Sequence, residues 1–252
     1  MSAHDGAGIH LDEVDLGPGV VAGFTDRRGG VSRPPFDSLD LGAHVGDDPA
    51  DVAVNRARLA ARLGVPVVFV DQVHGADVLA VGPDDVPADP LAPAGTADAL
   101  VTTSAGLALG VLVADCVPVL LADPDARVVA AVHAGRRGLV GGVVRAALDA
   151  LVARGADVRR VRAAIGPAVA GASYEVPSAM RDEVAAVEPA AAATTAWGTP
   201  ALDLPAGVAA QLAAAGVTYV ARARRDTWQD ETLYSYRRSP RTGRFAGVVR
   251  LV

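Results

Sequence analysis

Three side chains that can hold a soft or borderline metal ion stand next to predicted strands. His74 follows the β-rich run VPVVFVDQV, and Cys116 lies in the turn VADCVP. His133 follows the apolar run VVAAV. One cysteine and two histidines form a known catalytic zinc set, in which water takes the fourth position. The three residues are farther apart in sequence than the ligands of compact zinc modules, so the pattern also fits three ordinary structural residues.

The same residues fit a second kind of chemistry. Cys116 could act as a nucleophile with His133 or His74 as its base, as in cysteine hydrolases. Asp115 or Asp71 could then orient the imidazole of that base. Sequence spacing does not separate a zinc-bound thiolate from a nucleophilic one, so the residues alone leave both hypotheses open.

Anion-binding groups are the next candidate feature. All 23 basic residues are arginines, and the absence of lysine excludes a Schiff-base lysine, a pyridoxal-phosphate lysine and the lysine of a P-loop. Any bound anion must therefore be held by arginine or by backbone N–H groups. Arg136 and Arg137 follow His133 at the predicted start of a helix, and residues 27–32 (RRGGVS) form a similar loop. Both loops are candidates for binding a phosphate group, although solvated loops have the same composition.

A further arginine is predicted to face the interior. The sequence predicts a helix over residues 49–63, because Asp48 can cap its start, Pro49 suits its first position and Gly64 can end it. Arg56 falls on the apolar stripe of this helix. An inward-facing arginine is a candidate for contact with the substrate or with phosphate.

The C-terminal segment is dense in aromatic and arginine side chains. Residues 234–238 read YSYRR, and residues 242–244 read TGR. Such a segment could stack a purine ring or clamp a carboxylate. An exposed turn with packed tyrosines would have the same composition.

Short apolar runs separated by turn residues predict the strands that position these groups. They are typical of strands buried on both faces. We expect strands over residues 19–25, 65–73, 77–81, 99–103, 108–113, 117–122, 128–132, 161–165, 217–221 and 245–251, with 77–81 pairing back onto 65–73. We expect further helices over residues 139–153, 177–187 and 205–214.

The predicted strands outnumber the helices and cluster like hairpins, which favours an α+β fold. We expect a single domain over residues 1–252, with mixed β-sheets flanked by helices and a metal site at one sheet edge. Residues 1–17, which carry His4 and His10, are expected to be loosely ordered. No GxGxxG sequence follows a strand, so nothing indicates dinucleotide binding.

Composition limits the class of protein further. The 252 residues are 51% hydrophobic, which supports a large core, and the net charge of −6 argues against nucleic acid or an anionic membrane as a partner. The apolar stretch 105–122 is interrupted by Asp115, Cys116 and Pro118, which argues against a membrane span. The single cysteine excludes an internal disulfide, and the N-terminus lacks the apolar region of a signal peptide. We therefore expect a cytoplasmic protein.

Several motifs together resemble one known family. DQVHGADV, ADALVTT, VLVADCVPVLLAD, AAVHAGRRG, AAIGPAVAGASYEV and YSYRR–TGR resemble, in number and order, the purine nucleoside phosphorylase family, formerly described as multicopper polyphenol oxidase or laccase-like proteins. The resemblance runs from about residue 19 to the C-terminus. It implies that His74, Cys116 and His133 bind zinc and form the catalytic centre.

The resemblance also implies an activity. Family members cleave adenosine, inosine and methylthioadenosine with phosphate to the free base and the sugar 1-phosphate, and they also deaminate adenosine. Other members are described as peptidoglycan editing factors, which would fit a cysteine-hydrolase centre, and copper-linked phenol oxidation is also reported. With five histidines, a multicopper laccase centre is physically unfavourable, although one copper ion in place of zinc is conceivable.

Some positions depart from the family pattern. Arg136 stands where HAG is usually followed by Trp, Asp40 replaces the Asn of SLNLG, and Ala168 replaces the Cys of GPC. The first two changes affect the expected substrate preference. We expect Arg56, Asp40, Arg136 and Arg137 to bind the substrates, a purine nucleoside and phosphate, in a monomer or homodimer.

Overall fold

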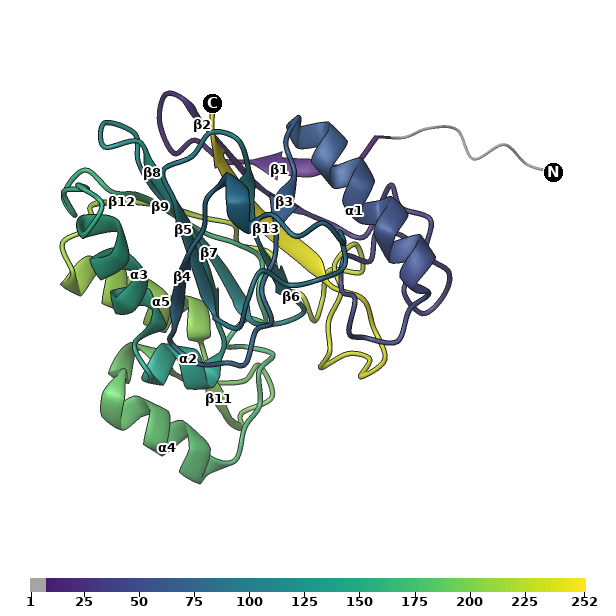
Figure 1. The fold of residues 1–252 in the computed structure, drawn as a ribbon. Helices are drawn as coiled ribbons and strands as arrows, with labels where there is room; N and C mark the ends of the chain where they lie inside the picture. The colour runs from purple at the N-terminus through teal and green to yellow at the C-terminus, as the bar shows by residue number, and fades with distance from the viewer. Residues whose placement is uncertain (1–7) are drawn as a thin grey trace.

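Two β-sheets pack face to face at the centre of the computed structural model, which describes residues 8–252 (Figure 1). One sheet has the strand order β1-β2-β13-β6-β3, with β1 Leu11–Glu13, β2 Val20–Thr25, β13 Phe245–Leu251, β6 Ala108–Val113 and β3 Val67–Val68. The other has the order β12-β9-β7-β8-β5-β4, with β12 Tyr219–Arg222, β9 Arg162–Ile165, β7 Val117–Asp123, β8 Val128–Ala134, β5 Ala99–Thr102 and β4 Val78–Ala80. A small hairpin joins β10 Ala192–Thr194 to β11 Pro200–Leu202.

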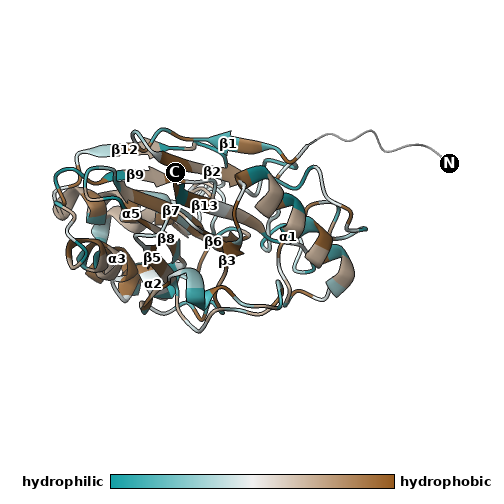
Figure 2. Cartoon of the chain, turned by 45° about the horizontal axis from the view of Figure 1, so that its top comes forward, coloured by the Kyte–Doolittle hydropathy of each residue, from teal (hydrophilic) through white to brown (hydrophobic). Residues whose placement is uncertain are grey.

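Alternating side chains divide the core into layers. In β8, Val129 and Ala131 pack between the sheets, whereas Val128, Ala130 and Val132 pack toward the helices. Every residue of β6, β7 and β8 is buried. The prediction of strands buried on both faces is therefore confirmed, and Figure 2 shows the apolar residues concentrated on these central strands.

Helices cover the outer faces of both sheets. The helices are α1 Pro49–Leu63, α2 Arg136–Val140, α3 Val143–Val152, α4 Ser178–Val187 and α5 Leu204–Ala214, with 3-10 turns η1 Pro83–Asp85 and η2 Pro189–Ala191. Apolar residues of α3 and α5 share one core cluster with β7, β8 and β9. Leu59 and Leu63 of α1 pack on β6 and β13. The result is the predicted single α+β domain with mixed sheets flanked by helices.

Helix α1 has the predicted bounds. The Asp48 side chain accepts a hydrogen bond from the backbone N–H of Ala50, and Gly64 ends the helix with a left-handed φ of 75°. Most residues other than glycine avoid this backbone region. Local capping chemistry therefore sets both ends of this helix.

Three of the predicted elements differ in the structure because of strand pairing and glycine placement. Residues 65–73 form only the two-residue strand β3, and β4 does not pair back onto them: it pairs in parallel with β5. The expected helix over residues 139–153 is divided into α2 and α3 at Gly141 and Gly142, where Gly142 has a φ of 84°. The edge strand β1 and the β10–β11 hairpin were not predicted.

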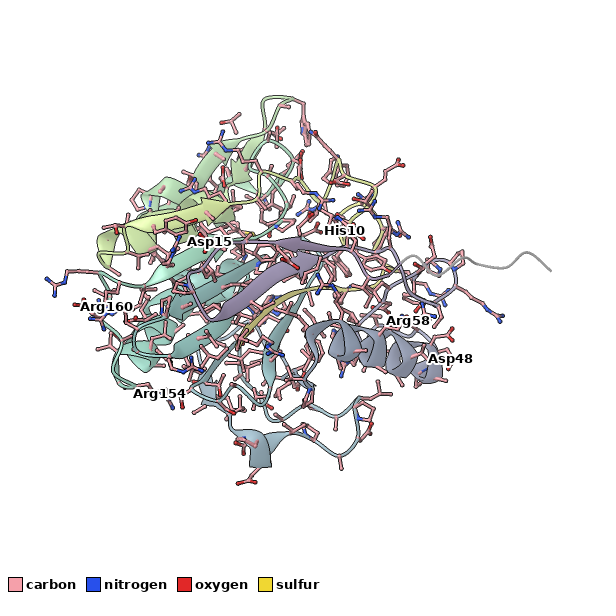
Figure 3. The ribbon with its side chains drawn as sticks, turned by 90° about the horizontal axis from the view of Figure 1, so that it is seen from above. His10, Asp15, Asp48, Arg58, Arg154 and Arg160 are labelled. Carbon is pink, nitrogen blue, oxygen red and sulfur yellow. The ribbon has the colours of Figure 1, made fainter. Side chains whose placement is uncertain are left out.

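The described part of the N-terminus contains a paired strand. Of residues 1–17, the structure describes 8–17, and within them β1 pairs with β2 from Leu11 to Glu13. His10 Nδ1 lies 3.0 Å from Asp26 Oδ2, next to β1 (Figure 3). Backbone pairing and this contact hold the segment against the sheet, whereas His4 lies outside the described residues. None of the helices in residues 8–252 is long and apolar enough to cross a membrane.

Candidate metal centre

His74, Cys116 and His133 meet at one end of the six-stranded sheet. Cys116 immediately precedes β7, and His133 is the penultimate residue of β8. Antiparallel pairing aligns His133 with Pro118, so the thiol and the imidazole reach the same sheet end. His74 enters from the loop before β4 with a φ of 61°.

The three side chains are close enough to share an ion. Their possible ligand atoms all lie within 4.8 Å of one another. Cys116 Sγ is 3.7 Å from His74 Nε2, and the two imidazole rings meet edge to face with centroids 4.8 Å apart. The cluster could therefore form a metal site, as the sequence predicts.

Asp98 organises this cluster and was not identified from the sequence. It is fully buried directly before β5, and its Oδ1 lies 2.7 Å from His133 Nδ1. This contact leaves Nε2 of His133 as the ring nitrogen available to an ion. The same carboxylate accepts the backbone N–H groups of His74, at 2.9 Å, and of Gly75. The signal that could have revealed it is an aspartate directly before the predicted strand in ADALVTT.

The electrostatics of the cluster favour a thiolate. Burial alone would raise the pKa of Cys116, but His133 first and His74 second outweigh it, so that the pKa falls to about 6. Burial likewise opposes a charged His133, but Cys116 and Asp98 raise its pKa to about 9. The thiolate is the form of cysteine that binds metals or attacks electrophiles, so this electrostatic balance fits either role.

Gly135 makes room for the cluster. A Cβ at this position would lie 2.7 Å from His74 Cδ2 and 3.2 Å from Cys116 Sγ. The glycine between His133 and Arg136 therefore allows the backbone to pass behind the three side chains.

The cluster lies in the wall of a cavity of about 620 Å³. Four arginines line this cavity: Arg136, Arg137, Arg237 and Arg244. Arg237 also stacks on Tyr174, with its guanidinium carbon 5.0 Å from the ring centroid. Arg136 and Arg137, both predicted to bind substrate, thus lie beside the cluster. Arg136 and Arg137 are the first two residues of α2, which is only five residues long, so their side chains rather than a long helix supply the positive charge.

Arg56 and Asp40, also predicted to bind substrate, are not among the residues that line the cavity. Arg56 is inward-facing as expected, but its guanidinium donates to the carbonyls of Leu41 and Pro90 at 2.9 and 2.8 Å. Asp40 accepts the backbone N–H groups of Gly42 and Arg244, both at 2.8 Å. Both side chains connect loops through hydrogen bonds to the backbone, and Asp40 binds the backbone N–H of Arg244.

The arginines of residues 27–32 are also occupied elsewhere. Arg27 donates to Asp37, and Arg28 pairs with Asp26. Neither is among the residues that line the cavity. Phosphate binding by this loop stays a prediction, and in the structure both arginines pair with neighbouring carboxylates.

The C-terminal segment is divided between core and cavity. Tyr234 is buried and donates to the carbonyl of Phe36, whereas Tyr236 and Arg237 line the cavity. Asp115 does not orient an imidazole, because its oxygens accept from the Thr227 hydroxyl and from the backbone N–H of Arg237, both at 2.6 Å. Asp98 has the orienting role considered for Asp115 and Asp71.

Comparisons with known proteins identify similar chains and a similar fold. A family model described as multi-copper polyphenol oxidoreductase laccase matches residues 21–252. The chain is 56% identical to a Streptomyces coelicolor protein named purine nucleoside phosphorylase, over 96% of this chain and 99% of that protein. It is 53% identical to a Mycobacterium tuberculosis protein of the same name, over 89% of each. The solved structure of YlmD from Geobacillus stearothermophilus matches with a TM-score of 0.86 and 35% identity, over 93% of this chain and 92% of that one.

Proposed function

The chain belongs to the multi-copper polyphenol oxidoreductase laccase family, and from that premise we propose that it is a zinc-dependent purine nucleoside phosphorylase. The substrates would be inosine and adenosine, with methylthioadenosine as a further substrate, and phosphate as the attacking group. The observation that supports this most is that the His74–Cys116–His133 cluster and four arginines share one cavity.

The donor set fits zinc. A thiolate and two imidazoles are ligands that zinc prefers. Their ligand atoms converge to within 4.8 Å of one another, close enough for one ion to bind all three. When bound, zinc would supply Lewis-acid or water-activating chemistry. Copper is the alternative ion for the same three donors.

The arginines fit an anionic co-substrate. Four positive charges, from Arg136, Arg137, Arg237 and Arg244, line the cavity. Its volume of about 620 Å³ lies in the range of roughly 300–1,000 Å³ that is usual for small-molecule sites. Guanidinium groups bind phosphate through paired, charge-assisted hydrogen bonds. Arg136 and Arg137 would hold phosphate beside the cluster, and Asp98 would keep the imidazole of His133 in place.

The test is a product assay with and without phosphate. Purified protein with measured zinc content is given inosine, and hypoxanthine release should rise with phosphate concentration and saturate, with ribose 1-phosphate formed in equal amount. Adenosine should give adenine by the same route, and inosine among its products would reveal deamination.

Two variants complete the experiment. Cys116→Ala should lose both zinc and activity, whereas Arg145→Gln, an exposed change on α3, should retain both. Base release at the same rate without phosphate would mean hydrolysis and would contradict the proposal. A covalent adduct on Cys116 during turnover would instead support the cysteine-hydrolase hypothesis.

A further inference from the structure

A second cavity of about 620 Å³ adjoins the metal cavity, and Arg237 lines both. This second cavity, here called the tryptophan groove, is lined by Trp197, Trp228, Glu175, Ser173 and Thr199 among others. Trp197 and Trp228 are the only tryptophans in the chain. They remain 53% and 36% exposed, although burying an indole is strongly favourable.

Trp197 is held in place despite its exposure. The Trp197 indole N–H donates to Glu175 Oε2 at 2.6 Å, and the turn that carries Trp197 is closed by a 2.8 Å contact between the hydroxyls of Thr195 and Thr199. An ordered, exposed indole loses little conformational entropy when a ring stacks on it.

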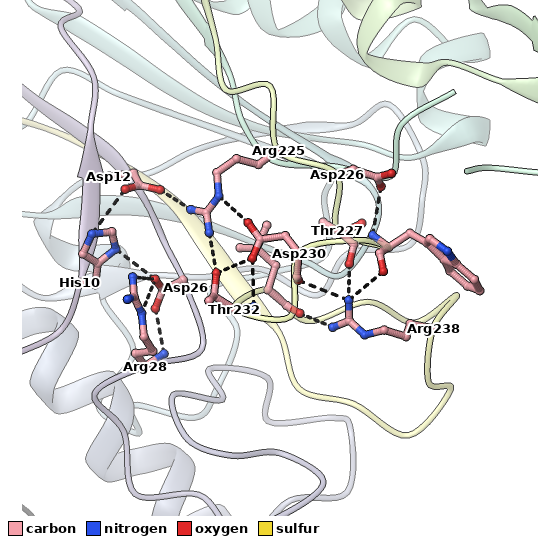
Figure 4. Close-up of polar contacts among 12 residues, drawn as sticks. His10, Asp12, Asp26, Arg28, Arg225, Asp226, Thr227, Asp230, Thr232 and Arg238 are labelled. Carbon is pink, nitrogen blue, oxygen red and sulfur yellow. Dashed lines mark hydrogen bonds and ion pairs between the residues drawn. The ribbon is translucent and has the colours of Figure 1, made fainter. Parts of the chain in front are cut away.

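The loop that carries Trp228 is fixed through its backbone. The N–H of Trp228 donates to Asp226 at 3.0 Å, and its carbonyl accepts from the guanidinium of Arg238 at 3.2 Å (Figure 4). Asp226 also accepts the hydroxyl of Ser173 at 2.6 Å, which ties this loop to the wall of the groove. The backbone of the Trp228 loop and the indole of Trp197 are therefore both tied to the wall of the groove.

The charges in the groove indicate which ligand it suits. Glu175 is a carboxylate that can accept hydrogen bonds from an amino group, and its contact with Trp197 lowers its pKa. Arg237 supplies a guanidinium that can bind an anion. A matching ligand carries a flat ring with hydrogen-bond donors and an anionic group attached to it.

We propose that the tryptophan groove is a second binding site, for a purine nucleotide whose ring bears an amino group. Trp197 and Trp228 stack on the ring, Glu175 accepts from the amino group, and Arg237 binds the phosphate. This site lies outside the metal cavity and does not depend on phosphorolysis there. Because Arg237 lines both cavities, an anion in one competes with an anion in the other for the same guanidinium.

Tryptophan fluorescence tests this proposal directly, because both tryptophans of the chain line the groove. Adenosine 5′-monophosphate, titrated into the full-length protein, should quench the fluorescence with a saturable curve. Ribose 5-phosphate, which lacks the ring, should leave it unchanged. Trp197→Leu and Trp228→Leu each keep one reporter and should weaken nucleotide binding about tenfold or more, as expected for the loss of a stacking partner.

Further variants separate the interactions. Arg237→Gln should weaken binding of the nucleotide by about tenfold but leave adenosine binding nearly unchanged. Arg145→Gln, exposed on α3, should bind the nucleotide like the wild type. An absent quench, or an unchanged affinity in both tryptophan variants, would overturn the proposal. Cys116→Ala should retain the quench, so failure of the groove and failure of the phosphorylase proposal give different results.

Discussion

At the residue scale, Asp98 is the group that links the two histidines of the cluster. Its carboxylate accepts from His133 and from the backbone of both His74 and Gly75. A neutral amide cannot replace it, because every partner around these two oxygens is a donor and the amide nitrogen would face an N–H group. The position of the His74 loop therefore depends on a charged oxygen pair.

Asp98→Asn is expected to weaken zinc binding by about 10- to 100-fold, the usual cost of losing an outer hydrogen bond to a ligating histidine. Competition with a chelator of known affinity measures this change. Asp77→Asn is the matched control, because Asp77 is exposed and meets Asp98 only through its backbone carbonyl. Equal zinc affinity in Asp98→Asn and the wild type would show that Asp98 does not position the ligands.

At the element scale, α1 shows how an inward-facing arginine can be structural. Arg56 is buried, its guanidinium lies over the ring of Phe69 at 4.6 Å, and two backbone carbonyls accept its N–H groups. Burial lowers the pKa of Arg56 to about 10, so the group remains charged at neutral pH. Through this charged side chain, α1 binds the loop that contains Leu41 and the loop that contains Pro90.

Arg56→Met should keep the contact with Phe69 but leave two carbonyls unpaired. We expect a loss of about 2 kcal/mol in the free energy of unfolding and an unchanged KM for phosphate. Arg58→Met is the control, because Arg58 lies on the exposed side of the same helix and donates only to Gly29. If folded Arg56→Met had a KM for phosphate more than tenfold above that of the wild type, the result would contradict the structural role and indicate that Arg56 binds substrate.

At the scale of the whole molecule, Asp40 joins the N-terminal half of the chain to the C-terminal strand region. It binds the backbone of Arg244, yet its second oxygen is buried without a hydrogen-bond partner. Burial raises the pKa of Asp40 to about 6. A raised pKa in the folded state means that folding favours the protonated carboxyl and opposes its ionisation. The free energy of unfolding should therefore fall as the pH rises from about 4 to about 6, by at most about 3 kcal/mol.

Asp40→Asn should remove this penalty, because the amide oxygen can still accept from Gly42 and Arg244. The stability advantage of the variant over the wild type should therefore be larger at about pH 8 than at about pH 5. Thermal unfolding of both proteins at the two pH values measures this difference. Asp84→Asn, an exposed carboxylate, should show no such gain. The same difference between Asp40→Asn and the wild type at both pH values would contradict the assignment.

The sequence by itself determined the local features of this protein. Capping residues set the ends of α1, continuous apolar runs predicted β6, β7 and β8, and the three possible metal ligands were recognisable from their types and positions at predicted strand ends. These features depend on interactions between residues that are close together in the sequence, so they can be predicted from the sequence alone. The resemblance to a known family added the expected activity.

Only the tertiary structure decided which polar groups share a space. It placed Asp98 behind His133, turned Arg56 and Arg27 toward backbone carbonyls, and brought Trp197 and Trp228 to one groove. It also paired β4 with β5 and not with β3. Charged side chains take their partners from segments distant in sequence, and strand pairing depends on which surfaces the whole core buries, so neither follows from local pattern.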